Sequence, residues 1–196
     1  NRCRRQRQMC IRDRLLVSSI FQQQSIEDLK VLSEQVKDSF VRLVNEDANA
    51  HMVGTAMSVI GRSFKQRIIE LGEEKLGKAP IPYCFLALGS MGRDEQLLVT
   101  DQDNAIILDD TYDEKKHGKY FEELSTFICD GLDQCGYVYC TGDIMATNPT
   151  WRMTRRQWEE CFADWIDDPN PKALLNASIF FDLDGVYGRL KWAEQL

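Results

Sequence analysis

The sequence predicts an α/β sheet domain that follows a helical lead-in. Two observations lead to this prediction. Apolar residues recur at helical spacing over residues 15–46 and again over residues 48–76. After a proline-containing break at residues 79–82, short apolar runs typical of buried strands alternate with amphipathic stretches typical of helices. A chain of 196 residues is long enough for one such domain with helical additions.

The lead-in covers residues 15–78 and the sheet domain residues 79–196, with residues 150–196 leading into a truncated C-terminal helical region. Trp158, Phe162 and Trp165 follow one another at the spacing of a packing face on a helix. In the sheet domain we expect strands at 83–88, 103–108, 137–140 and 179–183, helices at 113–135 and 151–166, a helical turn at 173–176, and the start of a helix at 188–196.

Composition and charge exclude several classes of protein. The formal net charge of −7 argues against general nucleic-acid binding, which requires a basic face. The seven cysteines include no C-x-x-C pair, which indicates reduced thiols in a cytoplasmic protein rather than a disulfide framework. No apolar run approaches the ~20 residues of a membrane span, so we expect a soluble chain without membrane contacts.

The first 14 residues differ from the rest of the chain. They contain six arginines and one aspartate, a pattern that a nucleic-acid-binding arm could also show. The stretch MCIRDR closely resembles a translated sequencing adapter, and we therefore interpret residues 1–14 as an artefact or a disordered segment. On this interpretation the chain is a fragment, and its natural upstream part is missing.

The stretch LGSMGRDEQLLVTDQDNAIIL, residues 88–108, has the strongest functional pattern. Asp101 and Asp103 alternate along an extended segment, so both carboxylates point to one side. Two adjacent carboxylates repel each other unless a cation lies between them, and Mg²⁺ prefers such oxygen ligands. Gly89 and Gly92 permit close backbone approach, and Ser90 adds a hydroxyl donor. The pattern predicts a phosphate cradle beside metal carboxylates.

Two other interpretations of these acids are weaker. An EF-hand loop that starts at Asp101 would need glycine at its sixth position and glutamate at its twelfth, where the sequence has Ile106 and Tyr112. A plain hairpin with two exposed aspartates does not account for the Gly-Ser turn upstream.

The spacing of these residues resembles the signature of the DNA polymerase β-like nucleotidyltransferase superfamily. Residues 89–95 (GSMGRDE) and 100–103 (TDQD) resemble the G-S-x-G-R-x-E…(S/T)-D-x-D form found in the N-terminal domain of protein-PII uridylyltransferases. The same form occurs in a bacterial family of signal-transduction nucleotidyltransferases, often preceded by cyclic-nucleotide-binding and CBS domains. Residues 140–151 (CTGDIMATNPTW) and 178–183 (SIFFDL) favour this second family. The resemblance covers about residues 70–196 and implies a nucleotidyltransferase-type mixed sheet flanked by helices.

The resemblance also implies roles for individual residues. Asp101 and Asp103 would hold two Mg²⁺ ions, Gly89 and Ser90 would bind the phosphates of an NTP, UTP or ATP, and Gly92 and Arg93 belong to the same loop. Glu95 either contacts phosphate with Arg93 or pairs with it to hold the loop. The superfamily adds a third carboxylate, for which Asp182 is the first candidate and Asp143 the second. The related families commonly have arginine where this chain has Asp184.

The expected function is Mg²⁺-dependent transfer of a nucleoside monophosphate to an acceptor hydroxyl. The acceptor is a tyrosine of a PII-type regulatory protein, another protein hydroxyl or a small molecule, and the sequence leaves these open. The alternative is a nucleotide-sensing module that binds the NTP without transferring it, downstream of sensor domains in the missing part.

Overall fold

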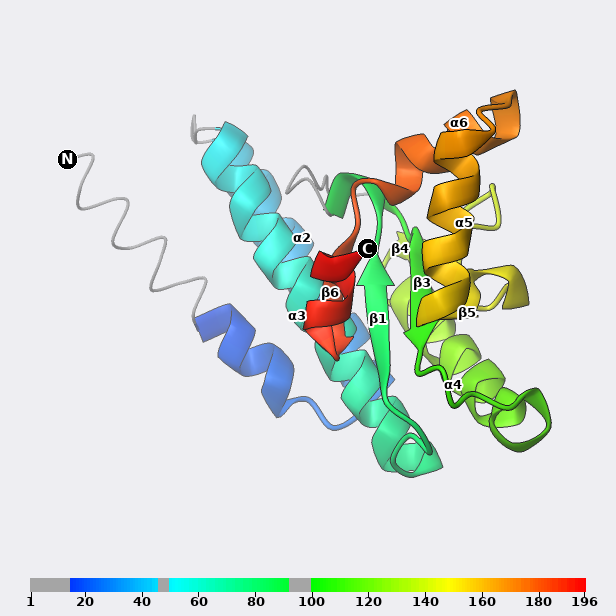
Figure 1. Ribbon diagram of the computed structural model, residues 1–196. Coiled ribbons are helices and arrows are strands. Elements are labelled where there is room, and N and C mark those ends of the chain that lie inside the picture. Colours follow the sequence, from blue (N-terminus) through cyan, green and yellow to red (C-terminus); the bar gives the residue numbers. More distant parts are fainter. Residues whose placement is uncertain (1–14, 46–49, 92–99) are drawn as a thin grey trace.

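The computed structural model describes residues 15–45, 50–91 and 100–196, and its architecture is a mixed sheet flanked by helices (Figure 1). The predicted fold class is therefore confirmed. A short helix at residues 15–22 comes first. The longer helices are α2 (Ile26–Asn45), α3 (Ala50–Leu76), α4 (Glu114–Gln134), α5 (Arg155–Asp167) and α6 (Pro171–Phe180). The short 3-10 turns are η1 (Gly89–Met91), η2 (Pro149–Trp151) and η3 (Leu190–Gln195).

The main sheet has the strand order β5-β3-β1-β6. Its strands are β1 (Tyr83–Ala87), β3 (Asn104–Leu108), β5 (Arg152–Thr154) and β6 (Asp184–Gly188). The central strand β1 is antiparallel to both of its neighbours, whereas β3 and β5 are parallel. A second, two-stranded parallel sheet joins β2 (Thr100–Asp101) to β4 (Tyr137–Val138). The chain thus enters β3 directly from the small sheet, three residues after Asp101.

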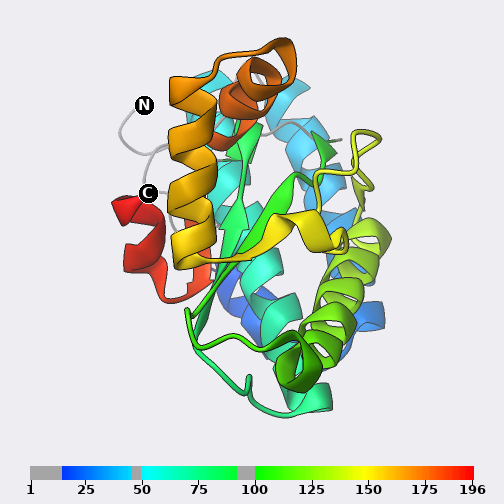
Figure 2. The ribbon, with the colours of Figure 1, turned by 45° about the vertical axis from the view of Figure 1, so that its right-hand side comes forward.

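Helices cover both faces of the main sheet (Figure 2). Strand residues that alternate along β1 and β3 point to opposite faces. Phe85 and Ile106 belong to a core shared with α2, α3 and α4. Leu86 and Ile107 belong to a second core with Trp158 and other aromatic residues of the C-terminal part. The long apolar runs of β1 and β3 are therefore explained by burial on both sides.

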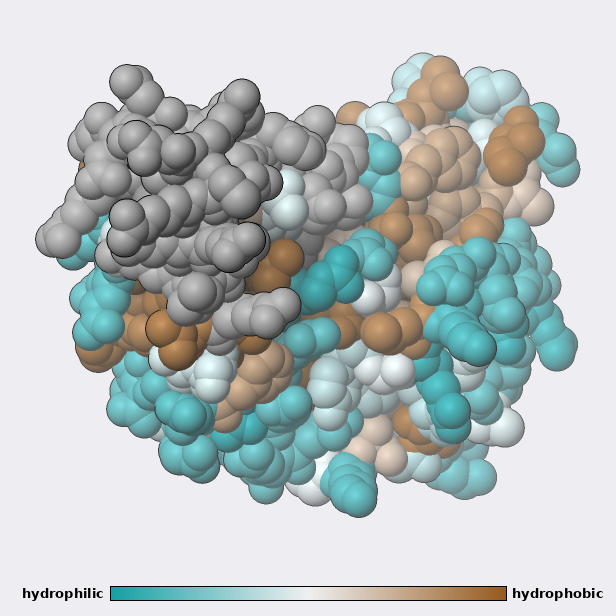
Figure 3. Space-filling model, turned by 90° about the vertical axis from the view of Figure 1, so that its left-hand side faces the viewer, coloured by the Kyte–Doolittle hydropathy of each residue, from teal (hydrophilic) through white to brown (hydrophobic). Residues whose placement is uncertain are grey.

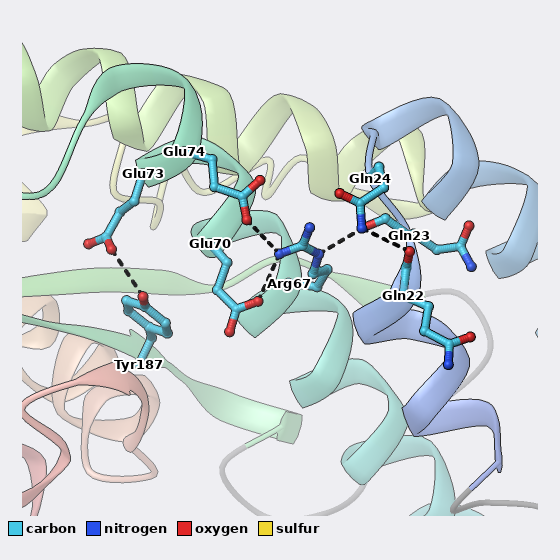
Figure 4. A network of polar contacts seen from close by, with 8 residues as sticks. All are labelled: Gln22, Gln23, Gln24, Arg67, Glu70, Glu73, Glu74 and Tyr187. Carbon is cyan, nitrogen blue, oxygen red and sulfur yellow. Dashed lines mark hydrogen bonds and ion pairs between the residues drawn. The ribbon is translucent and has the colours of Figure 1, made fainter.

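The helical lead-in is fastened to the sheet domain by polar contacts as well as by its core (Figure 4). The side chain of Arg67 on α3 donates to the carbonyl of Gln23 at 2.9 Å and pairs with Glu70 and Glu74. Further along the helix, Glu73 accepts a hydrogen bond from the hydroxyl of Tyr187 on β6 at 3.0 Å. Helix α3 is thus held on one side to the preceding chain and on the other to the sheet.

The C-terminal part differs from the sequence prediction in several places. The predicted helical turn at 173–176 is part of the ten-residue helix α6, and Gly188, the expected start of a helix, ends β6. The predicted strand at 179–183 is wrong, because Ile179 and Phe180 complete α6 and the strand begins only at Asp184. A short apolar run at the end of a buried helix looks like a strand in sequence. The aromatic helix begins at Arg155 rather than Trp151, because Thr154 and Gln157 form a capping box.

Residues 151–154 instead form the end of η2 and the strand β5. The packing predicted for the aromatic face of α5 is confirmed: Trp158 is buried, and its indole N–H donates to the carbonyl of Ile106 at 3.0 Å.

Among the residues that the structure describes, no helix combines the length and the apolar character that a membrane span requires. On the side shown in Figure 3, hydrophilic residues predominate along the lower edge.

Gly188 tests how tightly β6 is held against β1. It has a φ of 83°, and a Cβ there would overlap the carbonyl oxygen of Tyr83. Gly77 has a similar φ of 90° but no atom within 4 Å of a Cβ. We expect Gly77→Ala to lower the free energy of unfolding by about 1 kcal/mol through backbone strain alone. Gly188→Ala, which adds the overlap, should lower it by about 3 kcal/mol or more. Urea unfolding measures both, and equal losses would contradict this packing.

Candidate functional site

The Gly-Ser turn lies directly beside the two acids. At the end of β1 the amide of Leu88 donates to the carbonyl of Asp103 at 3.1 Å. Gly89 follows with a φ of 62°, a conformation that favours glycine, and a Cβ there would lie 3.4 Å from the Asp103 carboxylate. The hydroxyl of Ser90 lies 3.4 Å from that of Thr100, the neighbour of Asp101. The structure thus brings Gly89 and Ser90 to Asp101 and Asp103.

Residues 101–104 alternate between an open side and a buried side. Asp101 is exposed and Asp103 is half-buried, whereas Gln102 and Asn104 are completely buried. The Gln102 side chain donates to the carbonyls of Cys129 and Tyr137 at 3.0 and 2.9 Å. These bonds fasten the segment to α4 and β4. The side chains of an extended segment alternate in direction. Because Gln102 and Asn104 point inward, Asp101 and Asp103 both point outward.

Asn104 connects the same segment to the loop that follows β4. Its side-chain oxygen accepts from the amide of Ala146 at 2.8 Å, and its backbone amide donates to the carbonyl of Ile144 at 3.0 Å. Its side-chain nitrogen donates to the carbonyl of Gln102 at 3.1 Å. Asn104 therefore holds residues 144–146 against the start of β3.

Cys140 joins the two acids on the open side. Asp101 pairs with Val138 in parallel register, so two residues further on Asp103 stands beside Cys140. The ligand atoms of Asp101, Asp103 and Cys140 all lie within 4.8 Å of one another. Among the described residues this is the one group of three or more acidic, cysteine or histidine side chains that converge so closely. Sequence reasoning assigned Cys140 only as a reduced thiol, because its approach depends on the register of β2 and β4.

The surroundings of Asp103 act on its charge in opposite directions. Burial raises the pKa of the Asp103 carboxyl above its ordinary value, and the nearby charge of Asp101 raises it further. The hydrogen bond from the Cys140 thiol and the positive charge of Lys65 lower it. Burial also raises the pKa of the Cys140 thiol. A cation beside these groups would relieve the repulsion between the two carboxylates.

Lys65 is a charged neighbour that the sequence analysis missed. It lies on α3, its side chain is 1% exposed, and its ammonium group lies 5.7 Å from the centre of the Tyr137 ring. Burial lowers the pKa of Lys65 to about 7, while the charge of Asp103 opposes this shift. In the sequence, Lys65 follows Phe64 of the apolar stripe of a predicted helix. This position indicates burial but does not show which residue the lysine faces.

The two candidates for a third carboxylate lie outside this group. Asp182 is half-buried in the link between α6 and β6, and its carboxylate does not join the three ligand atoms within 4.8 Å. The pairing of β6 with β1 ends at Asp184 and Ala87, so Asp182 precedes the strand. Asp143 lies in an exposed turn with a φ of 55°, and its carboxylate accepts from the Asn148 side chain at 2.8 Å.

Asp184, at the position where the resemblance implies an arginine, has a cationic partner on α3. It forms an ion pair with Arg62 of α3, whose guanidinium also donates to the carbonyl of Gly185 at 3.0 Å. The charge at position 184 is therefore balanced from the lead-in. Gly92, Arg93 and Glu95 lie outside the described residues, so their predicted roles at the phosphates remain predictions.

Comparison with known protein families gives a match over most of the chain. Residues 34–172 match the family described as "Putative nucleotidyltransferase DUF294". The chain belongs to this family. The match includes the Gly-Ser turn, the two acids and Cys140, and it begins within α2. Membership supports nucleotidyl transfer as the general role, with an NTP as the class of substrate. No curated protein matches the chain.

Replacement of Asn104 tests whether the buried amides hold the site together. Asn104→Leu leaves the amide of Ala146 without its acceptor, so we expect the free energy of unfolding to fall by about 1–3 kcal/mol. The control Gln134→Leu changes an exposed amide at the end of α4 and should change stability by less than about 0.5 kcal/mol. Urea unfolding followed by tryptophan fluorescence measures both variants. Equal stability of Asn104→Leu and the unmodified chain would contradict the role of this network.

Proposed function

We propose that this chain is a Mg²⁺-dependent nucleotidyltransferase domain that transfers a nucleoside monophosphate from an NTP to an acceptor hydroxyl. The observation that supports the proposal most directly is the convergence of Asp101 and Asp103 beside the turn formed by Gly89 and Ser90. Family membership supports nucleotidyl transfer in general. The cation, the nucleotide and the acceptor belong to the proposal.

The donor set fits a divalent cation. Carboxylate oxygens are ligands that Mg²⁺ takes, and those of Asp101 and Asp103 lie close enough to share an ion. Two bound Mg²⁺ ions would supply charge neutralisation for the triphosphate and orient the reacting groups. Asp182 remains the proposed third carboxylate, with Asp143 as the second choice. Cys140 is considered separately below.

The remaining residues bind and orient. The hydrogen on the Cα of Gly89 leaves room for phosphate oxygens next to the acids, and the Ser90 hydroxyl can donate to them. The buried ammonium group of Lys65, when protonated, lowers the pKa of Asp103 and so favours its ionised carboxylate. The acceptor oxygen forms a bond to the α-phosphorus while the bond to pyrophosphate breaks. Pyrophosphate leaves with the bonding electrons, and the hydroxyl proton is released to solvent.

The proposed acceptor is a hydroxyl of a regulatory protein of the PII type, and the proposed donor is UTP or ATP. Both follow from the resemblance of residues 89–95 and 100–103 to the protein-PII uridylyltransferase form. A labelling experiment can identify the nucleotide and the acceptor together.

Incubation with α-phosphate-labelled UTP or ATP, Mg²⁺ and bacterial lysate tests the proposal. We expect label to appear on a protein acceptor, and Asp101→Asn or Asp103→Asn to reduce the rate by at least about 100-fold because a cation ligand is lost. The control Asp164→Asn makes the same change of charge at an exposed position on α5 and should keep the full rate. Transfer that persists in Asp103→Asn would contradict the proposal.

Two further variants test which residue is the third carboxylate, and one binding measurement tests the nucleotide-sensing alternative. If Asp182 is the third carboxylate, Asp182→Asn should behave like Asp103→Asn, whereas Asp143→Asn should retain activity. The reverse order would assign the role to Asp143. Tight NTP binding without label transfer to any acceptor would instead support the nucleotide-sensing module.

A further inference from the structure

Cys140 places a sulfur atom at the proposed cation site. Its Sγ and the carboxylate oxygens of Asp101 and Asp103 lie within 4.8 Å of one another, and its thiol donates a hydrogen bond to Asp103. The side chain is half-buried, so the sulfur faces the same open side as the acids. The proposed function does not use this group.

The backbone fixes the sulfur in this place. The pairing of β2 with β4 sets Cys140 beside Asp103. Just beyond the strand, the amide of Asp143 donates to the carbonyl of Cys140 at 3.0 Å, which closes a turn. The amide of Cys140 itself donates to the sulfur of Met145 at 3.4 Å. Backbone contacts on both sides of Cys140 therefore hold it where it can act as a ligand.

Gly89, in the turn η1 that follows β1, lies next to the donor Asp103. A Cβ at Gly89 would lie 3.4 Å from the carboxylate of Asp103. The residue next to that carboxylate therefore has no side chain of its own. Three donors from two paired segments thus converge next to a bare glycine. This arrangement leaves space at the donors on the side of the Gly-Ser turn.

The chemistry of the donors selects the cation. Carboxylates alone suit hard cations such as Mg²⁺, whereas thiolate ligands favour softer ions such as Zn²⁺ and Cd²⁺. In a set of one thiolate and two carboxylates, Mg²⁺ would bind the carboxylate oxygens and not the thiolate sulfur. Zn²⁺, in contrast, accepts both thiolate sulfur and carboxylate oxygen as ligands.

We propose that Cys140 is a third protein ligand at the site of Asp101 and Asp103, and that the site therefore binds thiophilic divalent cations such as Zn²⁺ or Cd²⁺ more tightly than Mg²⁺. This inference rests on the cation site of the proposed function and extends it to the choice of metal. On binding, the S–H bond of Cys140 gives its proton to solvent, and the sulfur electron pair forms the bond to the cation. No electron is transferred.

Titration of the full chain with Cd²⁺ tests this assignment without any nucleotide or turnover. A Cd²⁺–thiolate bond produces an ultraviolet charge-transfer absorption that Mg²⁺ does not give. We expect this band to saturate at one Cd²⁺ per chain, and Cys140→Ser to remove it and weaken Cd²⁺ binding by at least about tenfold. Mg²⁺ affinity, measured by calorimetry, should change by less than about threefold in Cys140→Ser.

The matched control is Cys161→Ser, which replaces another half-buried free thiol, on α5. It should keep both the band and the affinity of the unmodified chain. A band that survives in Cys140→Ser, or Cd²⁺ and Mg²⁺ affinities that fall equally in that variant, would overturn the proposal.

Protection from alkylation gives a second test on the unmodified chain, in case Cys140→Ser does not fold. We expect Zn²⁺ to slow the reaction of Cys140 with iodoacetamide at least about tenfold, as measured by mass spectrometry of the Cys140 peptide. Cys161 in the same sample is the internal control and should react at an unchanged rate, and Mg²⁺ should protect neither. Equal protection of both cysteines, or none, would overturn the assignment.

Failure of this inference can be told apart from failure of the proposed function. If Asp101→Asn weakens Mg²⁺ binding but Cys140→Ser leaves Cd²⁺ binding unchanged, the cation site stands and only the assignment of the third ligand is wrong. If Asp101→Asn changes the affinity for neither cation, the cation site itself fails, and the proposed function fails with it.

Discussion

Two completely buried amides, Gln102 and Asn104, are the constraint on which the rest of this site depends. A buried amide without hydrogen-bond partners is costly, and these two are satisfied by carbonyls and amides of α4, β4 and the loop at 144–146. Because alternate residues of an extended chain point to opposite sides, satisfying the amides directs Asp101 and Asp103 outward together. The repulsion between the two carboxylates is thus imposed by the interior of the protein.

The same constraint assembles the site from segments far apart in sequence. The loop that Asn104 holds contains the turn that follows Cys140, and the turn η1, directly after the neighbouring strand β1, contains Gly89 and Ser90. The lead-in contributes through α3, whose buried Lys65 acts electrostatically on Asp103 and whose Arg62 pairs with Asp184. Helix α3 therefore belongs to the site electrostatically as well as to the core. This interdependence suits a family whose match begins in α2 and continues beyond Cys140.

The sequence was sufficient for the fold class, the core strands β1 and β3, and the proximity of the Gly-Ser turn to the two acids, because these follow from local periodicity and spacing. It failed at residues 179–183, where a buried helix end and a strand have the same apolar pattern. The sequence did not predict that Cys140 and Lys65 lie at the site, for another reason. Their approach to Asp103 depends on the register of β2 with β4 and on the packing of α3, which are tertiary facts that no local pattern contains. Gly92 and Arg93 lie outside the described residues.

Anomalous X-ray diffraction from a crystal grown with Mn²⁺ and a non-hydrolysable NTP analogue tests the central claim most directly. The account predicts a manganese peak within bonding distance of carboxylate oxygens from both Asp101 and Asp103, with phosphate oxygens of the analogue at the Gly89–Ser90 turn. Manganese bound elsewhere, or a triphosphate seated away from these two carboxylates, would contradict it.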